Sequence, residues 1–194
     1  AQTPTDEPPC LFDALHPPGT LEAAEARIGA SVGQMKSVGT AGNSDDTRII
    51  PVVVHVIHNG GSENISKAQI ERQIDILNED YGKLPGTPGD GAGVDTRVRF
   101  CLAKTDPQGR CTDGIVRLKT TLTTHQPVDR STLKNLSFWD NTRYLNIYVV
   151  KSISGNVGGY SSFPYSPPDE DGLVVRHNLF GDNGTAAASG GRTA

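Results

Sequence analysis

The sequence predicts an α/β fold, with a mixed twisted sheet, one long crossover helix and a largely irregular segment in front of them. A run of β-branched residues from Ile49 to His58 ends in Asn-Gly-Gly, which is typical of a strand followed by a turn. An amphipathic helix over residues 66–81 follows, and several strand-like runs come after it. This order of strand, helix and further strands indicates a mixed sheet whose first crossover is helical.

The strand over residues 49–58 is almost continuously apolar, so we expect both of its faces to be covered. His55 and His58 stand three apart on it, and neighbouring side chains on a strand point to opposite faces. The two imidazoles therefore should not share a metal ion. Ordinary strand positions are the better interpretation of both.

The helix over residues 66–81 has the clearest start signal in the chain. Ser66 followed by Gln69 fits a capping box, in which the hydroxyl accepts from the backbone and the glutamine side chain reaches back. Ile65 and Ile70 are spaced for a hydrophobic staple. An apolar stripe repeats at helical spacing at Ile70, Ile74, Leu77 and Tyr81.

The other predicted strands are short apolar runs bounded by turn residues. They lie at residues 98–103, 114–118, 145–150, 158–163 and 172–176. The run at 158–163 is the weakest because it begins with two glycines. Asp106-Pro107-Gln108-Gly109 is a strong turn signal between the first two runs.

Residues 1–48 differ in composition from residues 49–194. They contain five prolines and few branched apolar residues, and only residues 21–35 have helical spacing. Such a segment is too poor in apolar residues to fold alone. We interpret it as a tail, a linker or a pro-segment that lies on the folded unit of residues 49–194.

Composition excludes some classes of partner. The net charge is −4 and no basic run is present, which argues against nucleic acid, and no apolar stretch approaches the roughly 20 residues of a membrane span. Removal of a signal peptide leaves a chain that begins with a small residue such as Ala1. A chain prepared by recombinant expression can begin in the same way. We therefore expect a secreted, extracellular protein, in which three cysteines mean one pair and one remaining thiol.

The residues alone give no complete catalytic set. The acidic run Asp169-Glu170-Asp171 lacks the glycine and the spacing of a calcium loop, so a solvated turn is the better interpretation. Ser161 and Ser162 lack the Gly-x-Ser-x-Gly setting of a hydrolase nucleophile. His, Cys and Glu residues with zinc-site spacing are absent from the sequence.

An ordered set of stretches across residues 50–194 resembles the pappalysin family of metzincin zinc metalloproteases. The stretches include Ile-Pro-Val-Val-Val-His-Val-Ile-His at 50–58, Asn-Glu-Asp-Tyr at 78–81, Arg-Phe-Cys-Leu-Ala at 99–103, Gly-Gly-Tyr-Ser-Ser-Phe-Pro at 158–164 and Gly-Gly-Arg-Thr-Ala at 190–194. The resemblance implies that residues 49–194 are a metzincin-like upper subdomain, incomplete because the chain ends at Ala194. In the family this last stretch leads into the zinc helix, His-Glu-x-x-His-x-x-Gly-x-x-His.

The resemblance implies the N-terminal portion of a secreted zinc endopeptidase, which hydrolyses peptide bonds with metal-activated water. The zinc ligands and the general base are then expected beyond Ala194, so this chain alone should be inactive. Its partners would be a protein or peptide substrate and the C-terminal part of the same protein. Calcium is a further possible ion in the full-length protein.

The resemblance also implies a substrate-binding strand. In metzincins the strand that borders the cleft pairs with the backbone of the bound peptide, and the matching residues here are Gly158, Gly159, Tyr160, Ser161 and Ser162. Main-chain hydrogen bonds at an exposed strand edge are a physical basis for that role. A plain glycine-rich edge strand is the alternative.

The family's pro-segment implies roles for the cysteines. Cys10 is placed to hold the enzyme latent as a thiolate ligand of zinc, while Cys101 and Cys111 flank the Asp106-Pro107 turn and can form a disulfide. Relatives have Arg-Cys-Gly where this chain has Pro-Cys-Leu, so a free Cys10, or one bonded to the C-terminal part, stays open. Arg48-Ile49 is the expected activation cut.

Two other functions remain open on the sequence. One is a non-catalytic binding or inhibitory module that keeps the protease scaffold without the zinc site. The other is an adhesion or surface domain with a superficial likeness to proteases. The sequence that follows Ala194 distinguishes both from the peptidase.

Overall fold

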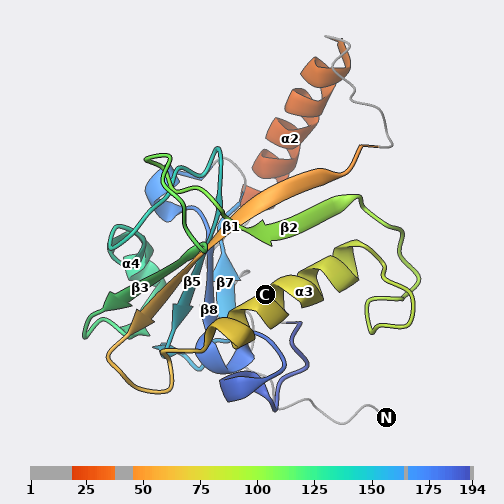
Figure 1. The fold of residues 1–194 in the computed structure, drawn as a ribbon. Helices are drawn as coiled ribbons and strands as arrows, with labels where there is room; N and C mark the ends of the chain where they lie inside the picture. Colours follow the sequence, from red (N-terminus) through yellow and green to blue (C-terminus); the bar gives the residue numbers. More distant parts are fainter. Residues whose placement is uncertain (1–18, 38–45, 164–165, 193–194) are drawn as a thin grey trace.

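A computed structural model describes residues 19–37, 46–163 and 166–192 of the chain, and its ribbon is drawn in Figure 1. The helices are α2 (Thr20–Ser37), α3 (Lys67–Tyr81) and the short α4 (Arg130–Lys134). Single turns of 3₁₀ helix lie at Pro127–Asp129, Pro168–Glu170, His177–Leu179 and Gly184–Ala186. None of the helices in these ranges is long and apolar enough to cross a membrane.

The main sheet has six strands, with the order β2-β1-β5-β8-β7 and with β3 paired to the second half of β1. The strands are β1 (Arg48–His58), β2 (Val98–Leu102), β3 (Ile115–Lys119), β5 (Leu145–Val150), β7 (Gly159–Ser161) and β8 (Leu173–Arg176). All pairs are parallel except β7 with β8. Two-residue strands β4 (Thr124–His125) and β6 (Ser152–Ile153) form a second small sheet. The predicted mixed sheet with a helical crossover is confirmed.

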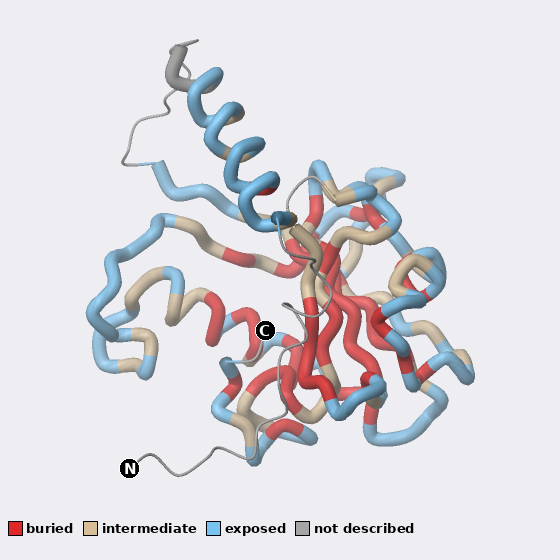
Figure 2. Tube along the Cα trace, turned by 180° about the vertical axis from the view of Figure 1, so that it is seen from behind, coloured by how far each residue is buried: buried red, intermediate tan, exposed pale blue. Residues whose placement is uncertain are grey.

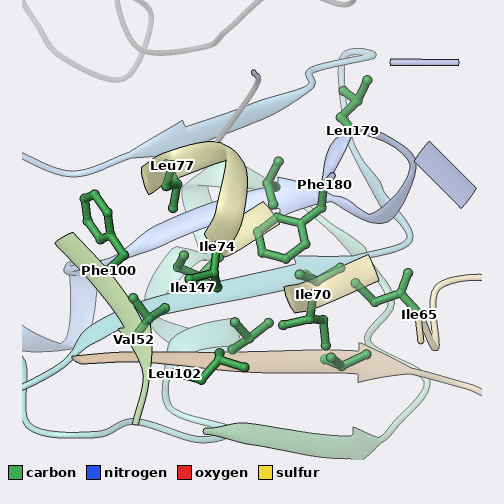
Figure 3. Packing of buried hydrophobic residues seen from close by; sticks show 14 residues of the cluster. Val52, Ile65, Ile70, Ile74, Leu77, Phe100, Leu102, Ile147, Leu179 and Phe180 are labelled. Carbon is green, nitrogen blue, oxygen red and sulfur yellow. The ribbon is translucent and has the colours of Figure 1, made fainter. Parts of the chain in front are cut away.

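The central strand β1 is covered on both faces, as its apolar run predicts. Val52, Val54 and Val56 belong to the cluster beneath α3, together with Ile70, Ile74, Leu77, Leu179 and Phe180 (Figure 3). Ile57 packs on the opposite face with Tyr148, Tyr160 and Leu133. Side chains alternate along a strand, so one strand supplies both clusters. The central strands therefore form the buried core of the described chain, where red predominates in Figure 2.

Helix α3 begins as predicted but differs in one detail of its cap. Ser66 Oγ accepts from Gln69 N at 3.1 Å, and the staple residues Ile65 and Ile70 are both buried in the core. The Gln69 side chain does not reach back to Ser66. It donates instead to backbone carbonyls of the 177–185 segment, so the capping box is only half formed.

Replacement of Ser66 by alanine should lower the free energy of unfolding by about 1 kcal/mol, because it removes the acceptor of an N-terminal helix N–H. Ser62→Ala is the matched control, since Ser62 is exposed and lies in the loop before the helix. Urea unfolding of both variants measures the difference. Equal stability of the two variants would contradict the capping role.

Helix α2 confirms the helical spacing seen within the first 48 residues. It is a largely exposed element outside the sheet, and of its described side chains only Ala24 is fully buried (Figure 2). Its apolar side chains Leu21 and Val32 are exposed, and the interpretation of residues 1–48 as a segment that lies on the folded unit stays a prediction.

Candidate functional site

Strand β7 forms one edge of the main sheet. It pairs antiparallel with β8 through Gly159↔Val175, Tyr160↔Val174 and Ser161↔Leu173, and its other side has no strand partner in the described part of the chain. Gly159 permits this pairing, since a Cβ there would lie 2.8 Å from the carbonyl oxygen of Val174. The strand is shorter than the predicted run at 158–163. Its backbone nevertheless lies where an extended peptide can add to the sheet.

The side chains of this edge lie in different environments. Tyr160 is only 2% exposed and points into the core, while Ser161 and Ser162 are half-buried. Gly158 and Gly159 are buried, and Gly158 O accepts from Arg176 N at 3.0 Å. The predicted substrate-binding residues are thus brought together in space. Substrate pairing by this backbone stays a prediction, and the buried Tyr160 ring faces inward.

The hydroxyl of Tyr160 lies 2.5 Å from His125 Nε2, and the two rings stack with centroids 5.7 Å apart. Burial lowers the pKa of His125 to about 4, against a smaller opposing effect of Asp129. The imidazole is therefore neutral at pH 7. Burial also raises the pKa of Tyr160. A neutral phenol hydrogen-bonded to a neutral imidazole is the protonation state that this environment favours.

A buried lysine lies below the same edge. The Lys134 side chain is fully buried, and its Nζ donates to Ser162 Oγ at 3.4 Å, to Gly172 O at 3.2 Å and to Glu170 O. Burial lowers its pKa to about 8, while Asp171 acts in the opposite direction. Arg130, at the start of the same short helix, forms an ion pair with Glu170 at 2.6 Å. Helix α4 therefore holds both ends of the 162–172 loop.

Residues 177–187 are attached to α3 by two buried glutamines. Gln69 Nε2 donates to His177 O at 2.9 Å and to Phe180 O at 2.8 Å, and its Oε1 accepts from Thr185 N at 3.0 Å. Gln73 Oε1 accepts from Gly181 N at 2.6 Å. Both glutamine side chains are almost completely buried. The segment after β8 is thereby fixed on the helix that covers the sheet.

An ion-pair network continues the attachment to the end of the described chain. Arg72 bridges Glu79 at 2.5 Å and Asp182 at 2.8 Å, and Arg192 contacts Asp80 at 2.9 Å. The pKa of Arg72 is raised by its bonds to Asp182 and Glu79. Gly191 packs closely, because a Cβ at this position would lie 2.6 Å from Ile76 Cδ1. The Gly-Gly-Arg stretch is therefore placed by α3.

The two histidines of β1 have separate environments, as predicted. His55 is fully buried, stacks on Tyr148 with centroids 4.7 Å apart and bonds through Nε2 to Asn146 Oδ1 at 3.0 Å. Burial lowers its pKa to about 4, with Asn146 acting in the opposite direction. His58 lies on the other face, and its Nδ1 accepts from Gly60 N. The pair does not form a metal site.

Within the described ranges, the structure brings no three His, Cys, Asp or Glu side chains together as a metal site. Glu170 is paired with Arg130, and Asp171 accepts from Asn141 at 2.7 Å, which agrees with a turn at 169–171. The suggested latency ligand Cys10 lies outside the described residues. The residues that are described do not form a zinc site.

The predicted disulfide is not formed in the structure. Cys101 is half-buried, Cys111 is exposed, and both are free. The cause is register: Cys111 forms its antiparallel bridge with Thr105, while Cys101 lies in β2 opposite Pro51. Equal distances from the Asp106 turn in sequence therefore do not place the two thiols opposite each other.

The expected activation cut lies at the start of β1. Arg48 and Ile49 are exposed, but they already belong to the strand and face Val98 and Arg99 of β2. Arg48 N also donates to Arg97 O at 2.8 Å. A protease would have to loosen this end of β1 before it could bind the bond in extended form. The cut itself stays a prediction.

Three solved structures resemble the chain. Mirolysin in complex with compound 9 is 38% identical over 77% of this chain and 61% of its own, with a TM-score of 0.67. Mature mirolysin of Tannerella forsythia, in complex with a cleaved peptide, is 36% identical over 77% and 60%, with a TM-score of 0.66. A promirolysin mutant of the same organism is 34% identical over 90% and 61%, with a TM-score of 0.69. No protein-family model and no curated protein matches.

Mirolysin is a metzincin of the pappalysin family. The chain matches the N-terminal part of a pappalysin-like metzincin. It spans about three fifths of the length of the mirolysin chains. The mostly parallel sheet, the crossover helix and the antiparallel edge strand β7 of this pappalysin-like chain agree with the metzincin-like fold expected from the sequence.

Sequence reasoning missed three buried polar residues of this pappalysin-like chain, His125, Lys134 and Gln69. His125 and Lys134 stand in a stretch where no strand or helix was predicted, and Gln69 was interpreted as part of the capping box. A lysine in a helix of five residues carries no sequence sign that it will be buried. The burial of Lys134 becomes visible only from its contacts with Ser162, Glu170 and Gly172.

Proposed function

We propose that this chain is the N-terminal portion of a secreted zinc endopeptidase that hydrolyses peptide bonds in proteins or peptides. The observation that carries the proposal is the identity of 34–38% to mirolysin and promirolysin, together with the free edge of β7. One of those structures holds a cleaved peptide, which supports a peptide substrate for this protein too. The zinc ligands and the general base would come from the residues after Ala194.

Within this proposal each part of the chain has a defined task. The backbone of Gly158 to Ser162 would pair with the substrate, and α3 would hold the stretch at 181–192 that leads toward the zinc helix. When bound, zinc would supply an activated water for attack on the peptide carbonyl. Because the described residues supply neither ligand nor base, their contribution is to place the substrate and the connecting segment.

The promirolysin match, which covers 90% of this chain, supports a pro-segment before β1. Residues 1–48 would form it, with Cys10 as the latency ligand and Arg48-Ile49 as the cut that releases it. Thiolate binding to the zinc would displace the catalytic water, which is why removal of the segment would switch the enzyme on.

The coding sequence that continues past Ala194 gives the first test. We expect His-Glu-x-x-His-x-x-Gly-x-x-His to follow directly. The whole gene product should then bind one zinc ion and cleave peptides, and replacement of the motif's glutamate by glutamine should abolish cleavage while zinc stays bound. A reading frame that continues without this motif would overturn the proposal.

The latency part is tested on the same protein. Cys10→Ala should cleave a peptide before the pro-segment is removed, whereas Cys101→Ala, the control, should stay as inactive as the unprocessed protein. Equal latency of the two variants would exclude the cysteine switch and leave the peptidase assignment untouched.

A further inference from the structure

Strand β7 needs support that its own sequence does not provide. It has three residues and one strand partner, and it follows Gly158. A strand of this length has little stability of its own, and glycine adds to the entropy lost on ordering. The backbone of such an edge strand keeps one extended conformation only if other groups stabilise it.

The buried ammonium of Lys134 is placed to do this. Its acceptors are Ser162, one residue beyond the end of β7, and the carbonyls of Glu170 and Gly172, just before β8. Ser162 Oγ also donates to Glu170 O. One cation therefore bridges the exit of β7 and the entry of β8, and it closes the 162–172 loop at its base.

The geometry of Lys134 differs from that of an ordinary surface lysine. Its nearest acceptors are two carbonyls and a hydroxyl, and the described ion pairs of the chain include none with this ammonium. Nζ also lies 5.8 Å from the centre of the Tyr160 ring, on the inner side of β7. Burial of a cation costs free energy unless several strong hydrogen bonds offset it, and hydrogen bonds to a charged group are the stronger kind.

We propose that Lys134 is a positioning residue for the substrate-pairing edge: its ammonium fixes the β7–β8 hairpin so that the free edge of β7 stays in line for an extended peptide. The role in substrate pairing rests on the proposed function. The clamp on the hairpin rests only on the contacts of Lys134 and can be tested without peptidase activity.

Amide hydrogen exchange of the intact 194-residue chain tests the clamp. Lys134→Met keeps the length of the side chain and removes the charge, and we expect amides in 159–163 and 171–174 to exchange about tenfold faster or more, while α3 exchanges as in the wild type. Lys151→Met is the matched control, because Lys151 is exposed. Ser162→Ala removes one of the three acceptors of the ammonium, together with the bond from Ser162 Oγ to Glu170 O, and a smaller rise in the same segment is expected.

Unchanged exchange of the hairpin in both Lys134→Met and Ser162→Ala would overturn the clamp. If Lys134→Met unfolds, Ser162→Ala decides alone. In the whole gene product, Lys134→Met should raise KM for a peptide about tenfold with a smaller change in kcat, since ground-state pairing is lost. Faster exchange with an unchanged KM would reject the substrate role, and a wild type without any cleavage would reject the proposed function while the clamp stands.

Discussion

Replacement of Gln69 by alanine should lower the free energy of unfolding by about 3–5 kcal/mol, the largest single effect that we expect in this chain. The side-chain amide supplies the partners of His177 O, Phe180 O and Thr185 N, all at 2.8–3.0 Å. Its removal leaves Phe180 O and Thr185 N without these partners, at a cost of about 1–3 kcal/mol for each unpaired group, while His177 O keeps its bond from Thr185 Oγ1. A cavity next to Gly184 adds to the loss, since Gly184 packs against Gln69.

Glu71→Ala gives the control for this change. Glu71 lies on the same helix, is exposed and makes a weak ion pair with Lys67 at 4.0 Å, so its loss should cost less than about 0.5 kcal/mol. Urea unfolding at pH 7 measures both variants. A cost below about 1 kcal/mol for Gln69→Ala would mean that the 177–185 segment is not attached as the structure has it.

Acidification should destabilise the fold well before the carboxylates are protonated. His55 has a pKa of about 4 in the folded chain, lowered from 6.5 by burial, so the unfolded chain binds more protons between these values. Its contribution to stability is present above pH 6.5 and is lost as the pH falls toward 4. For His55 alone this amounts to about 2 kcal/mol between pH 7 and pH 5. His125 shifts in the same direction and adds to the loss.

Urea unfolding at pH 7 and pH 5 measures this loss, and two variants assign it. His55→Gln removes the titrating group. The loss of unfolding free energy between pH 7 and pH 5 should therefore be about 2 kcal/mol smaller in this variant than in the wild type. His58→Gln is the control, because His58 is half-buried on the opposite face of β1. If both variants keep the wild-type difference between the two pH values, the buried neutral imidazole is not the cause.

Much of the sheet could be predicted from the sequence because local patterns determine it. The run of β1 is marked by its β-branched residues and the Asn-Gly-Gly turn after it, and α3 by an apolar stripe at helical spacing. The staple of Ile65 and Ile70 needs no distant partner. The sequence pattern of each of these elements is local to it, and the structure confirms both elements.

The groups that hold the candidate site could not be predicted, because their partners are distant in sequence. Lys134 meets Gly172 across 38 positions, and Gln69 meets Phe180 across 111. Strands β4 and β6 have two residues each, too few for a period. The prediction of the disulfide was wrong for a related reason. Equal sequence distances of two cysteines from a turn do not fix which residues face each other across it. The edge strand was predicted from its residues as the weakest of the runs, and only its role in substrate pairing came from the likeness to a family.

The pairing of β1 has a consequence for how the chain acquires its structure. Its neighbours β2, β3 and β5 begin 50, 67 and 97 residues after Arg48, as their first residues Val98, Ile115 and Leu145 show. Parallel partners so far apart close large loops before any contact is gained, which slows folding. During synthesis the most apolar strand would leave the ribosome long before β5 exists. Until then its open edges can join another chain, so we expect aggregation to compete with productive folding whenever β5 is delayed or truncated.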